Sequence, residues 1–347
     1  MKFIRLLAAG VAVALLLIGC GGGGDGTTGG GQPADSQTSP KQASDLTELQ
    51  LTLESRANPE DSSILLGDRL DYFADAGLDL YVLGPSTPSF ALRYLAQGTD
   101  IVLAPLPQIL MAQEEGRQVE AVGSMIPGTG MSMIWLPDSG INGIAGLKGK
   151  TIGTTGLSSQ EGFLEFILGQ AGLKLSDVKL SDVGYSDDLV SKLKRGKIDA
   201  IFGGSWNVEG AALEADGLNP VVTKATDLGI PPFDELVFAA KPGRYAKEPD
   251  LLKSFLEAAY QGAAAVKEDP VAGSEAVVDK SLEFVSPKEG EAGTKATAPL
   301  FSEAAPIDRK RAAILIDWMY QRRMIKRKIP VSRLIAVEGG AGEPSKP

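Results

Sequence analysis

Histidine is absent from the 347-residue sequence, and cysteine occurs once, at Cys20. Because catalytic Ser-His-Asp and Cys-His systems need an imidazole base, both are excluded, together with zinc or iron sites that use histidine ligands. Positive charge is also in deficit, with 34 Lys and Arg residues against 44 Asp and Glu residues. Nucleic-acid-binding proteins need a basic surface over the phosphates. We therefore expect no nucleic acid as a partner, and we assign no metal or cofactor.

The apolar run near the N-terminus is short, with 13 residues from Leu6 to Ile18 after two basic residues. A membrane-spanning helix needs about 20 residues, whereas the hydrophobic part of a secretory signal peptide has this shorter length. The run ends in Leu17-Ile18-Gly19-Cys20, which resembles the lipobox of bacterial lipoproteins. The resemblance implies a signal peptide at residues 1–19 and a lipid anchor on Cys20, at the extracytoplasmic face of the cell membrane. An ordinary signal peptide with an incidental cysteine is the alternative.

Low-complexity sequence separates the cysteine from a folded body. Residues 21–43 are mostly Gly, Ser, Thr, Gln and Pro, and such a segment buries too little apolar surface to fold. We therefore predict a flexible tether over residues 20–47 and a disordered tail over residues 336–347. The chain is 43% hydrophobic, so the body between these segments has enough apolar residues for about two domains with real cores.

Strands and helices alternate along the body in two similar units. In the first unit we predict strands at 49–54, 78–83 and 100–104 and helices at 62–74 and 89–96. In the second unit we predict strands at 150–154, 178–183 and 198–202 and helices at 159–170 and 187–194. Both units end a helix on glycine, at Gly98 and Gly196, shortly before an aspartate that starts a strand. Glycine suits this position because a positive φ costs it no steric clash.

This alternation predicts an α/β protein with two lobes, parallel-rich sheets, flanking helices and a central cleft. A strand at 234–240 leads back to the first lobe, and helices follow at 249–266, 271–281 and 305–324. We place lobe 1 at residues 48–133 and 238–335 and lobe 2 at residues 134–237. The expected hinge crossings lie near Gly128–Trp135 and Pro231–Asp234. One large doubly wound domain is the alternative.

The segment Ser158-Ser159-Gln160-Glu161 opens the helix at the first strand–helix junction of lobe 2. Ser158 and Glu161 fit a capping box, in which hydroxyl and carboxylate satisfy exposed amide groups. The N–H groups and hydroxyls of the same turn also suit a polar or anionic ligand group. The two roles are compatible, so we take Ser158, Ser159 and Gln160 as candidate ligand-binding residues.

The loop after the last strand of the second unit combines an aromatic, an amide and a carboxylate in Trp206, Asn207 and Glu209. Such a set suits a flat nitrogen heterocycle, because indole stacks on the ring while amide and carboxylate pair with ring nitrogens and amino groups. In the alternative, which has equal weight, Trp206 closes the core of the lobe and Glu209 is solvated at a helix start.

Further candidates lie in loops and crossings at the same cleft. They are Asn58, Pro105, Leu106, Ser132, Phe233 and Asp234. Asp234 and Glu235 could form the acid–base pair of a hydrolase, but adjacent residues of a strand point to opposite faces, so we discount this role. Residues 308–333 contain nine Lys or Arg residues. A solvated helix face is their default interpretation, and contact with acidic lipid head groups is the alternative.

Four phrases of the sequence resemble a known family. They are Asp75–Asp79, Gly146–Gly153, Ile198–Glu209 and Gly229–Val237. The chain is similar to solute-binding lipoproteins of ABC importers, in the family that includes thiamine pyrimidine-precursor binding proteins, aliphatic sulfonate and taurine binders, and the eukaryotic pyrimidine-precursor synthase. The third and fourth phrases resemble the pyrimidine-precursor subgroup in particular.

The resemblance implies a monomer with a type II periplasmic-binding fold that closes on a small ligand and presents the closed form to an ABC permease and its ATPase. The implied ligand is a planar nitrogen heterocycle, with an aliphatic sulfonate or taurine as the alternative. The sequence departs from the subgroup at Asp61–Ser63, where a histidine is usual, and at Ser205, where an aromatic is common. Without histidines the chain cannot be the synthase, and we expect no enzyme. A carboxylate-only enzyme such as a glycosidase and a non-transport envelope lipoprotein are the other hypotheses.

Overall fold

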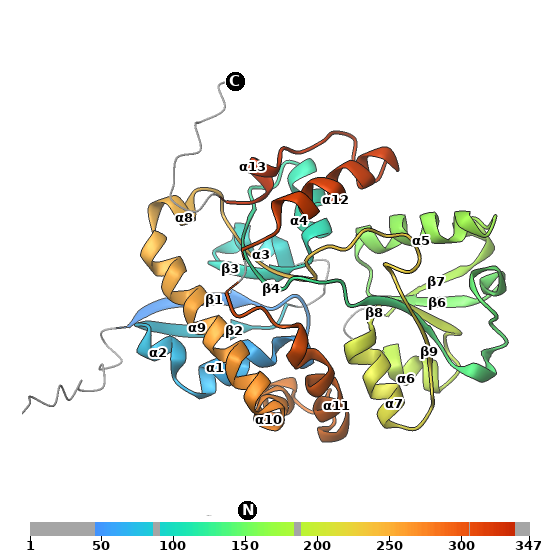
Figure 1. Cartoon of the computed structure of the whole chain (residues 1–347), viewed down its shortest axis with the longest axis horizontal. Helices are drawn as coiled ribbons and strands as arrows, with labels where there is room; N and C mark the ends of the chain where they lie inside the picture. The colour runs from blue at the N-terminus through green and yellow to red at the C-terminus, as the bar shows by residue number, and fades with distance from the viewer. Residues whose placement is uncertain (1–45, 86–90, 184–188, 305, 337–347) are drawn as a thin grey trace, which may run out of the picture. The chain divides into compact units, whose positions relative to one another are not determined.

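Two five-stranded sheets with flanking helices make up the protein in the computed structural model, which describes residues 46–85, 91–183, 189–304 and 306–336 (Figure 1). We call the first sheet with its helices lobe 1 and the second sheet with its helices lobe 2. All of the described residues belong to one compact unit. The predicted α/β class with two sheets is confirmed.

Lobe 1 takes strands from two distant parts of the chain. Its strands are β1 (Thr47–Thr52), β2 (Leu78–Leu83), β3 (Ile101–Ala104), β4 (Glu120–Ile126) and β10 (Leu236–Ala240). They lie in the order β2-β1-β3-β10-β4. β1 pairs in parallel with β2 and β3, whereas β10 runs antiparallel to β3 and β4. Every residue of β3 and β10 is buried, which is typical of central strands covered on both faces.

Lobe 2 repeats this plan. Its strands are β5 (Met131–Trp135), β6 (Thr151–Thr154), β7 (Lys179–Asp182), β8 (Ala200–Ser205) and β9 (Val221–Lys224). They lie in the order β7-β6-β8-β5-β9. β6 pairs in parallel with β7 and β8, and β5 runs antiparallel to β8 and β9. In each sheet, therefore, the fourth strand is the one that enters from the other lobe, as the internal duplication suggests.

Helices follow most of the strands. Those of the first half of lobe 1 are α1 (Ser62–Arg69), α2 (Tyr72–Asp75), α3 (Ala91–Gln97) and α4 (Leu106–Glu114). Lobe 2 has α5 (Ser158–Gln170), α6 (Leu189–Lys194) and α7 (Ala211–Ala215). After β10 come α8 (Arg244–Lys247), α9 (Pro249–Glu268), α10 (Pro270–Ser281), α11 (Pro287–Thr297), α12 (Arg309–Gln321) and α13 (Val331–Leu334). Within the described ranges, none of the helices is both long enough and apolar enough to span a membrane.

The strand pairing shifts the boundaries expected from the sequence. β5 begins at Met131 and pairs with β8, so Met131–Met133 lie in the second sheet instead of lobe 1. Leu236 and Val237 start β10 and lie in the first sheet instead of lobe 2. At the N-terminal side, Thr47 already belongs to β1, although the tether was expected to include it. The ends of β5 and β10 lack alternation, because both faces of these strands are buried. Thr47, in contrast, is an exposed polar residue at the start of β1.

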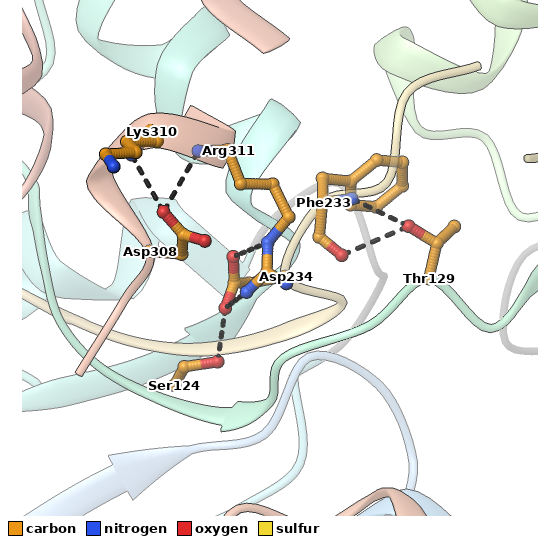
Figure 2. A network of polar contacts seen from close by, with 7 residues as sticks. All are labelled: Ser124, Thr129, Phe233, Asp234, Asp308, Lys310 and Arg311. Carbon is orange, nitrogen blue, oxygen red and sulfur yellow. Dashed lines mark hydrogen bonds and ion pairs between the residues drawn. The ribbon is translucent and has the colours of Figure 1, made fainter. Parts of the chain in front are cut away.

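The chain crosses between the sheets twice, at residues 127–130 and 225–235, and the two crossings are bonded to each other. The Thr129 hydroxyl donates to the carbonyl oxygen of Phe233 at 3.1 Å and accepts from its N–H at 2.9 Å (Figure 2). The N–H groups of Gly130 and Met131 donate to the Glu235 carboxyl group at 2.8 and 3.2 Å. The crossings thus lie side by side, as expected of a hinge.

One apolar core continues from the first lobe into the second. Its buried members include Val102 of β3, Phe163 of α5 and Leu315 of α12. The Phe163 ring stacks on Phe233 of the second crossing, with ring centroids 5.8 Å apart, and it also contacts Trp318 of α12. The predicted signal peptide, the lipidated Cys20, most of the tether and all but the first residue of the tail lie outside the described residues.

Candidate functional site

A cavity of about 130 Å³ lies between the lobes, and residues of both lobes line it. Glu54 and Pro105 reach it from the segments that follow β1 and β3, and Thr155 and Ser205 reach it from the ends of β6 and β8. We call it the interlobe cavity. It is located where the parallel strands end, which is the place at which α/β sheets bind ligands.

The charged residues in the described lining of the interlobe cavity are all glutamates. Four glutamates contribute to it, namely Glu54, Glu60, Glu209 and Glu235, and no Lys or Arg is among its described lining residues. Glu54 follows β1, Glu60 lies in the 3₁₀ turn Pro59–Asp61, Glu209 lies in the π-helical turn Trp206–Gly210 and Glu235 directly precedes β10. The cavity therefore offers acceptors, and donors when the carboxyl groups are protonated.

Burial raises the pKa of three of these carboxyl groups, those of Glu54, Glu60 and Glu235. Burial raises the pKa of Glu54 well above its usual value, and the nearby carboxyl groups of Glu235 and Glu60 raise it further. Burial and the charge of Glu60 raise the pKa of Glu235 to about 8, although the N–H groups of Met131 and Gly130 lower it. Several like charges in one buried space cannot all ionise together. With a pKa of about 8, Glu235 is the lining carboxyl group that is protonated near neutral pH.

Glu209 is the predicted site residue whose position agrees best with the expectation. Its carboxylate accepts from the Ser205 N–H at 2.6 Å and lines the interlobe cavity. Ser159 and Gln160 of α5, Phe233 of the second crossing and Pro105 after β3 also line it. Thr155 forms two hydrogen bonds with the Gln160 amide. The Gln160 Nε2 donates to the Thr155 hydroxyl at 2.7 Å, and the Gln160 Oε1 accepts from the Thr155 N–H.

Asn58 lines the interlobe cavity, but its amide is used in the local turn. Its Oδ1 accepts from the Glu60 N–H at 2.9 Å, and its Nδ2 donates to the Ser55 hydroxyl and to the Asp61 carboxylate. The side chain caps the turn Pro59–Asp61. Asn58 therefore shapes the cavity through the loop that it holds.

Trp206 differs from the expected stacking arrangement. It is absent from the described lining of the interlobe cavity, and the Lys224 ammonium group lies over its ring, 4.3 Å from the centroid. The π-helical turn sends the indole toward β9, while Val208 and Glu209 of the same turn face the cavity. The alternative in which Trp206 covers its own lobe agrees better with this position.

Asn207 lies at the lobe contact, and it too is absent from the described cavity lining. The side chain is fully buried, and its Nδ2 donates to the Glu60 carboxylate at 3.0 Å and to the Thr297 hydroxyl at 2.9 Å. Glu60 and Thr297 both belong to lobe 1. Asn207 therefore ties the lobes together, while its Oδ1 has no hydrogen-bond partner among the described residues.

Asp234 points away from the cavity and forms a buried ion pair. Its carboxylate accepts from the Ser124 hydroxyl at 2.7 Å and from the Arg311 guanidinium at 3.1 and 3.3 Å (Figure 2). Glu235 points to the opposite side, toward Gly130, as expected of adjacent residues in an extended segment. Arg311 of the basic region thus holds α12 to lobe 1, so the region is not merely a solvated helix face.

Three further expectations differ from the structure. Leu106 is a fully buried core residue, and the Ser132 hydroxyl donates to the Gly130 carbonyl oxygen at 2.9 Å, so neither lines the cavity. Ser158 lines a neighbouring cavity instead. The predicted capping box with Glu161 is absent, because α5 already begins at Ser158 and its N-cap is Leu157, which makes no side-chain cap.

The sequence analysis did not identify Glu54, Glu60 and Glu235 as site residues. One signal for Glu54 was available, because it lies just beyond the carboxyl end of the first parallel strand, where α/β ligand sites form. Glu60 and Glu235 carry no such signal, since their approach to the cavity depends on the packing of the two lobes. In the part of the chain that the structure describes, no three His, Cys, Asp or Glu side chains are grouped as metal ligands.

The sequence is similar to a known protein family and to several named proteins. The pattern described as "NMT1/THI5 like" matches residues 58–272. A putative thiamine biosynthesis protein of Haemophilus influenzae is 24% identical over 81% of this chain and 89% of its own length. The formylaminopyrimidine-binding protein of Halalkalibacterium halodurans is 26% identical over 72% of this chain and 70% of its own length.

A solved structure shares the fold. It is the periplasmic aliphatic sulphonate-binding protein of Escherichia coli, with a TM-score of 0.65, 19% identity, and coverage of 83% of this chain and 97% of the other. This likeness concerns the arrangement of the two sheets, which is that of a periplasmic binding protein. The family match covers more than half of the sequence. The chain belongs to the NMT1/THI5-like family.

Proposed function

We propose that this chain is the extracytoplasmic solute-binding component of an ABC importer and that it captures a small amino-substituted nitrogen heterocycle, of the aminopyrimidine type, between its lobes. The observation that carries the proposal is the lining of the interlobe cavity, which contains four glutamates and no described Lys or Arg. A ligand with N–H donors or positive charge complements this lining, because glutamates are the charged residues of its described part.

The size of the interlobe cavity limits the ligand to about one ring. Its volume is about 130 Å³, and an apolar cavity of about 150 Å³ in another protein binds benzene. Apolar side chains of Met131, Phe233, Leu157 and the two prolines at 105 and 107 supply the surface for a ring face. A single six-membered heterocycle therefore fits both the space and its mixed lining.

The raised pKa values suit an aminopyrimidine in particular. Such a ring presents an amino donor next to a ring nitrogen acceptor, and a protonated carboxyl group offers the complementary acceptor and donor. Burial raises the pKa of Glu235 to about 8, so this group is protonated near neutral pH. In this proposal Glu235 and Glu209 pair with the ring edge, while Ser159 and Gln160 contact a substituent.

The same lining disfavours an aliphatic sulfonate. A sulfonate is an anion and needs cationic or N–H donors, and its approach to four carboxyl groups is repulsive wherever these are ionised. The relative from Halalkalibacterium halodurans, whose name gives formylaminopyrimidine as its ligand, supports the heterocycle. Sulfonate or taurine binding is thus the second candidate, and only the similarity of the fold supports it.

We propose binding without catalysis. A carboxylate-only glycosidase needs an acid and a second carboxylate across a sugar, and 130 Å³ is small for that substrate. The family's synthase depends on histidine, which this sequence lacks. We further propose that Cys20 carries the lipid anchor and that a permease with its ATPase receives the loaded monomer. The alternative, an envelope lipoprotein without a transport role, does not explain the carboxyl-lined cavity.

Titration calorimetry of the mature chain tests the ligand class. We expect heat with a 4-aminopyrimidine and none with taurine. Glu209→Gln should weaken the binding by about tenfold or more, since a hydrogen bond to a charged group is worth about 1.5–3 kcal/mol. Glu161→Gln is the matched control, because Glu161 is exposed on α5 and absent from the cavity lining. Heat with taurine and none with ring compounds would contradict the proposal.

A further inference from the structure

A second cavity of about 160 Å³ adjoins the interlobe cavity. The two cavities share three wall residues, namely Glu54, Pro105 and Leu157. The second cavity extends from them between α3 and α4 of lobe 1 and the first residue of α5 in lobe 2, Ser158. A ligand ring in the interlobe cavity would therefore lie next to the second cavity, across the three shared residues.

The second cavity has the cationic groups that the first lacks. Arg93 of α3 and Arg117, which follows α4, both line it, together with the Gln108 amide and the Ser158 hydroxyl. Two carboxyl groups also line it, Glu54 and Glu115. Burial raises the pKa of Glu54 well above its ordinary value, and Glu115 is already paired with Arg117.

The ion pair in the second cavity is weakly held. Arg117 contacts the Glu115 carboxylate at 3.1 and 3.2 Å, and the two side chains are 35% and 52% exposed. Exposed ion pairs of this kind contribute little, because water screens them and both side chains lose freedom. The Arg117 guanidinium can therefore exchange Glu115 for an anionic group of a ligand at small cost, and its planar donors suit a carboxylate or a phosphate.

We propose that the second cavity binds an anionic substituent of the ring ligand, a carboxylate or a phosphate, through Arg93 and Arg117. This inference rests on the proposed function, because it assumes that the ring occupies the interlobe cavity. The ligand is then dipolar, with its amino-bearing edge among the glutamates and its acidic end at the guanidinium groups. The arrangement orients the ligand, because the reversed pose would place the anion among carboxyl groups and the amine beside two arginines.

The test compares three ligands that share one aminopyrimidine ring and differ in a neutral hydroxymethyl, a carboxymethyl or a phosphorylated hydroxymethyl substituent. Calorimetry on the full mature chain measures each affinity. We expect the anionic compounds to bind about tenfold or more tightly than the neutral one, since charge-assisted hydrogen bonds are the strong ones. The compound that gains more identifies the acidic group as carboxylate or phosphate.

Arginine variants assign the gain to the second cavity. Arg93→Gln and Arg117→Gln should each remove most of the preference for the anion and leave the affinity of the neutral ring unchanged. Arg69→Gln is the control, because Arg69 pairs with Asp279 at the surface of lobe 1, away from both cavities. Equal affinities of all three compounds would overturn the inference and leave the proposed function standing. Failure of the neutral ring and of both anionic rings to bind would overturn both.

Discussion

Glu235 has two sets of contacts at once, with the hinge and with the cavity. Its carboxyl group accepts from the N–H groups of Gly130 in the first crossing and of Met131, the first residue of β5, and it lines the interlobe cavity. Burial and the nearby Glu60 raise its pKa from 4.5 to about 8. Because its folded pKa lies above the unfolded value, the folded state binds this proton more tightly than the unfolded state does.

The unliganded protein should therefore lose stability as the pH rises. The contribution of Glu235 is fully present below about pH 4.5 and is lost progressively as the pH rises to about 8. Glu235→Gln keeps a neutral side chain and should flatten this part of the curve of melting temperature against pH. Thermal unfolding between pH 4 and pH 9 measures the effect. Glu161→Gln, on the exposed face of α5, should retain the wild-type slope, and an equally steep slope in Glu235→Gln would contradict the assignment.

Asn207→Ala should weaken the contact between the lobes. It removes two donated hydrogen bonds and leaves the buried Glu60 and Thr297 side chains without that partner. Losing a partner of buried polar groups costs about 1–3 kcal/mol. Urea unfolding of the variant measures the change in the free energy of unfolding. The exposed Asn142 provides the control, and Asn142→Ala should change the stability by less than about 0.5 kcal/mol.

The residue types of the loop Trp206–Glu209 were predictable from the sequence, but their directions were not. The sequence analysis treated Trp206, Asn207 and Glu209 as one binding set. In the structure a π-helical turn sends them to three places, namely the Lys224 ammonium group, the lobe contact and the cavity. Such a turn is rare, and no spacing pattern in a single sequence predicts it.

At the scale of elements, α1 and α9 pack with their backbones in close approach. The Cα atom of Gly262 in α9 lies near Gly67 of α1, and a Cβ atom built on Gly262 would lie 2.0 Å from the carbonyl oxygen of Ser63. A backbone oxygen cannot move aside as a side chain can. Glycine is therefore required at this crossing, and the two helices would have to separate to accept any other residue.

Gly262→Ala should destabilise the protein by about 3 kcal/mol, at the upper end of the range for overpacking. Gly169→Ala is the matched control, since Gly169 is exposed near the end of α5 and a Cβ atom there would meet nothing within 4 Å. Alanine should stabilise that position by about 0.5–1 kcal/mol, because glycine weakens a helix. Chemical unfolding of both variants measures the difference. A neutral result for Gly262→Ala would show that α1 and α9 separate easily.

Helices and strands with a clear hydrophobic periodicity were predictable from the sequence, and those without such a periodicity were missed. The strands at β1, β2, β6 and β8 and the helices at α5, α9 and α10 agree with the predicted positions within a few residues. β4 and β5 were overlooked, because their buried runs lack alternation. α11 has the sequence PKEGEAGTKAT, with hardly any apolar residue to reveal a period. Its buried Gly290 and Thr294 pack against α10 of the same lobe, whereas Gly293 and Thr297 lie against Asn207 of the other lobe. Only the tertiary structure reveals these contacts.

At the scale of the whole described body, the lobes meet on both sides of the cavity. On one side α11 contacts α7, and Asp216, the residue after α7, pairs with Lys288 of α11 at 3.0 Å. On the other side the rings of Phe163, Phe233 and Trp318 form an apolar seam. Separation of the lobes would expose this seam to water and break the polar contacts. The described arrangement is therefore the one in which the lobes are closed on the cavity.

Phe163→Ala should loosen the closed arrangement. The ring is fully buried, and removal of a buried phenylalanine ring costs about 3–5 kcal/mol. We expect lower stability and a larger radius of gyration in small-angle scattering, because the seam between α5 and α12 is opened. Ile314→Ala in α12 is the control, since Ile314 is 58% exposed and its loss should change neither quantity. An unchanged radius for Phe163→Ala would mean that the polar contacts of α11 alone keep the lobes together.

The position of Glu235 in both the cavity wall and the hinge has a consequence for the transport role that we propose. Glu235 accepts from the Gly130 and Met131 N–H groups and also lines the cavity. We expect a ligand that pairs with this carboxyl group to change these two hydrogen bonds, which would couple ligand binding to the angle between the lobes. Linkage of this kind is reciprocal. If a membrane partner binds one lobe angle more tightly, it must change the protein's affinity for the ligand by some factor. The ligand must then change the protein's affinity for that partner by the same factor.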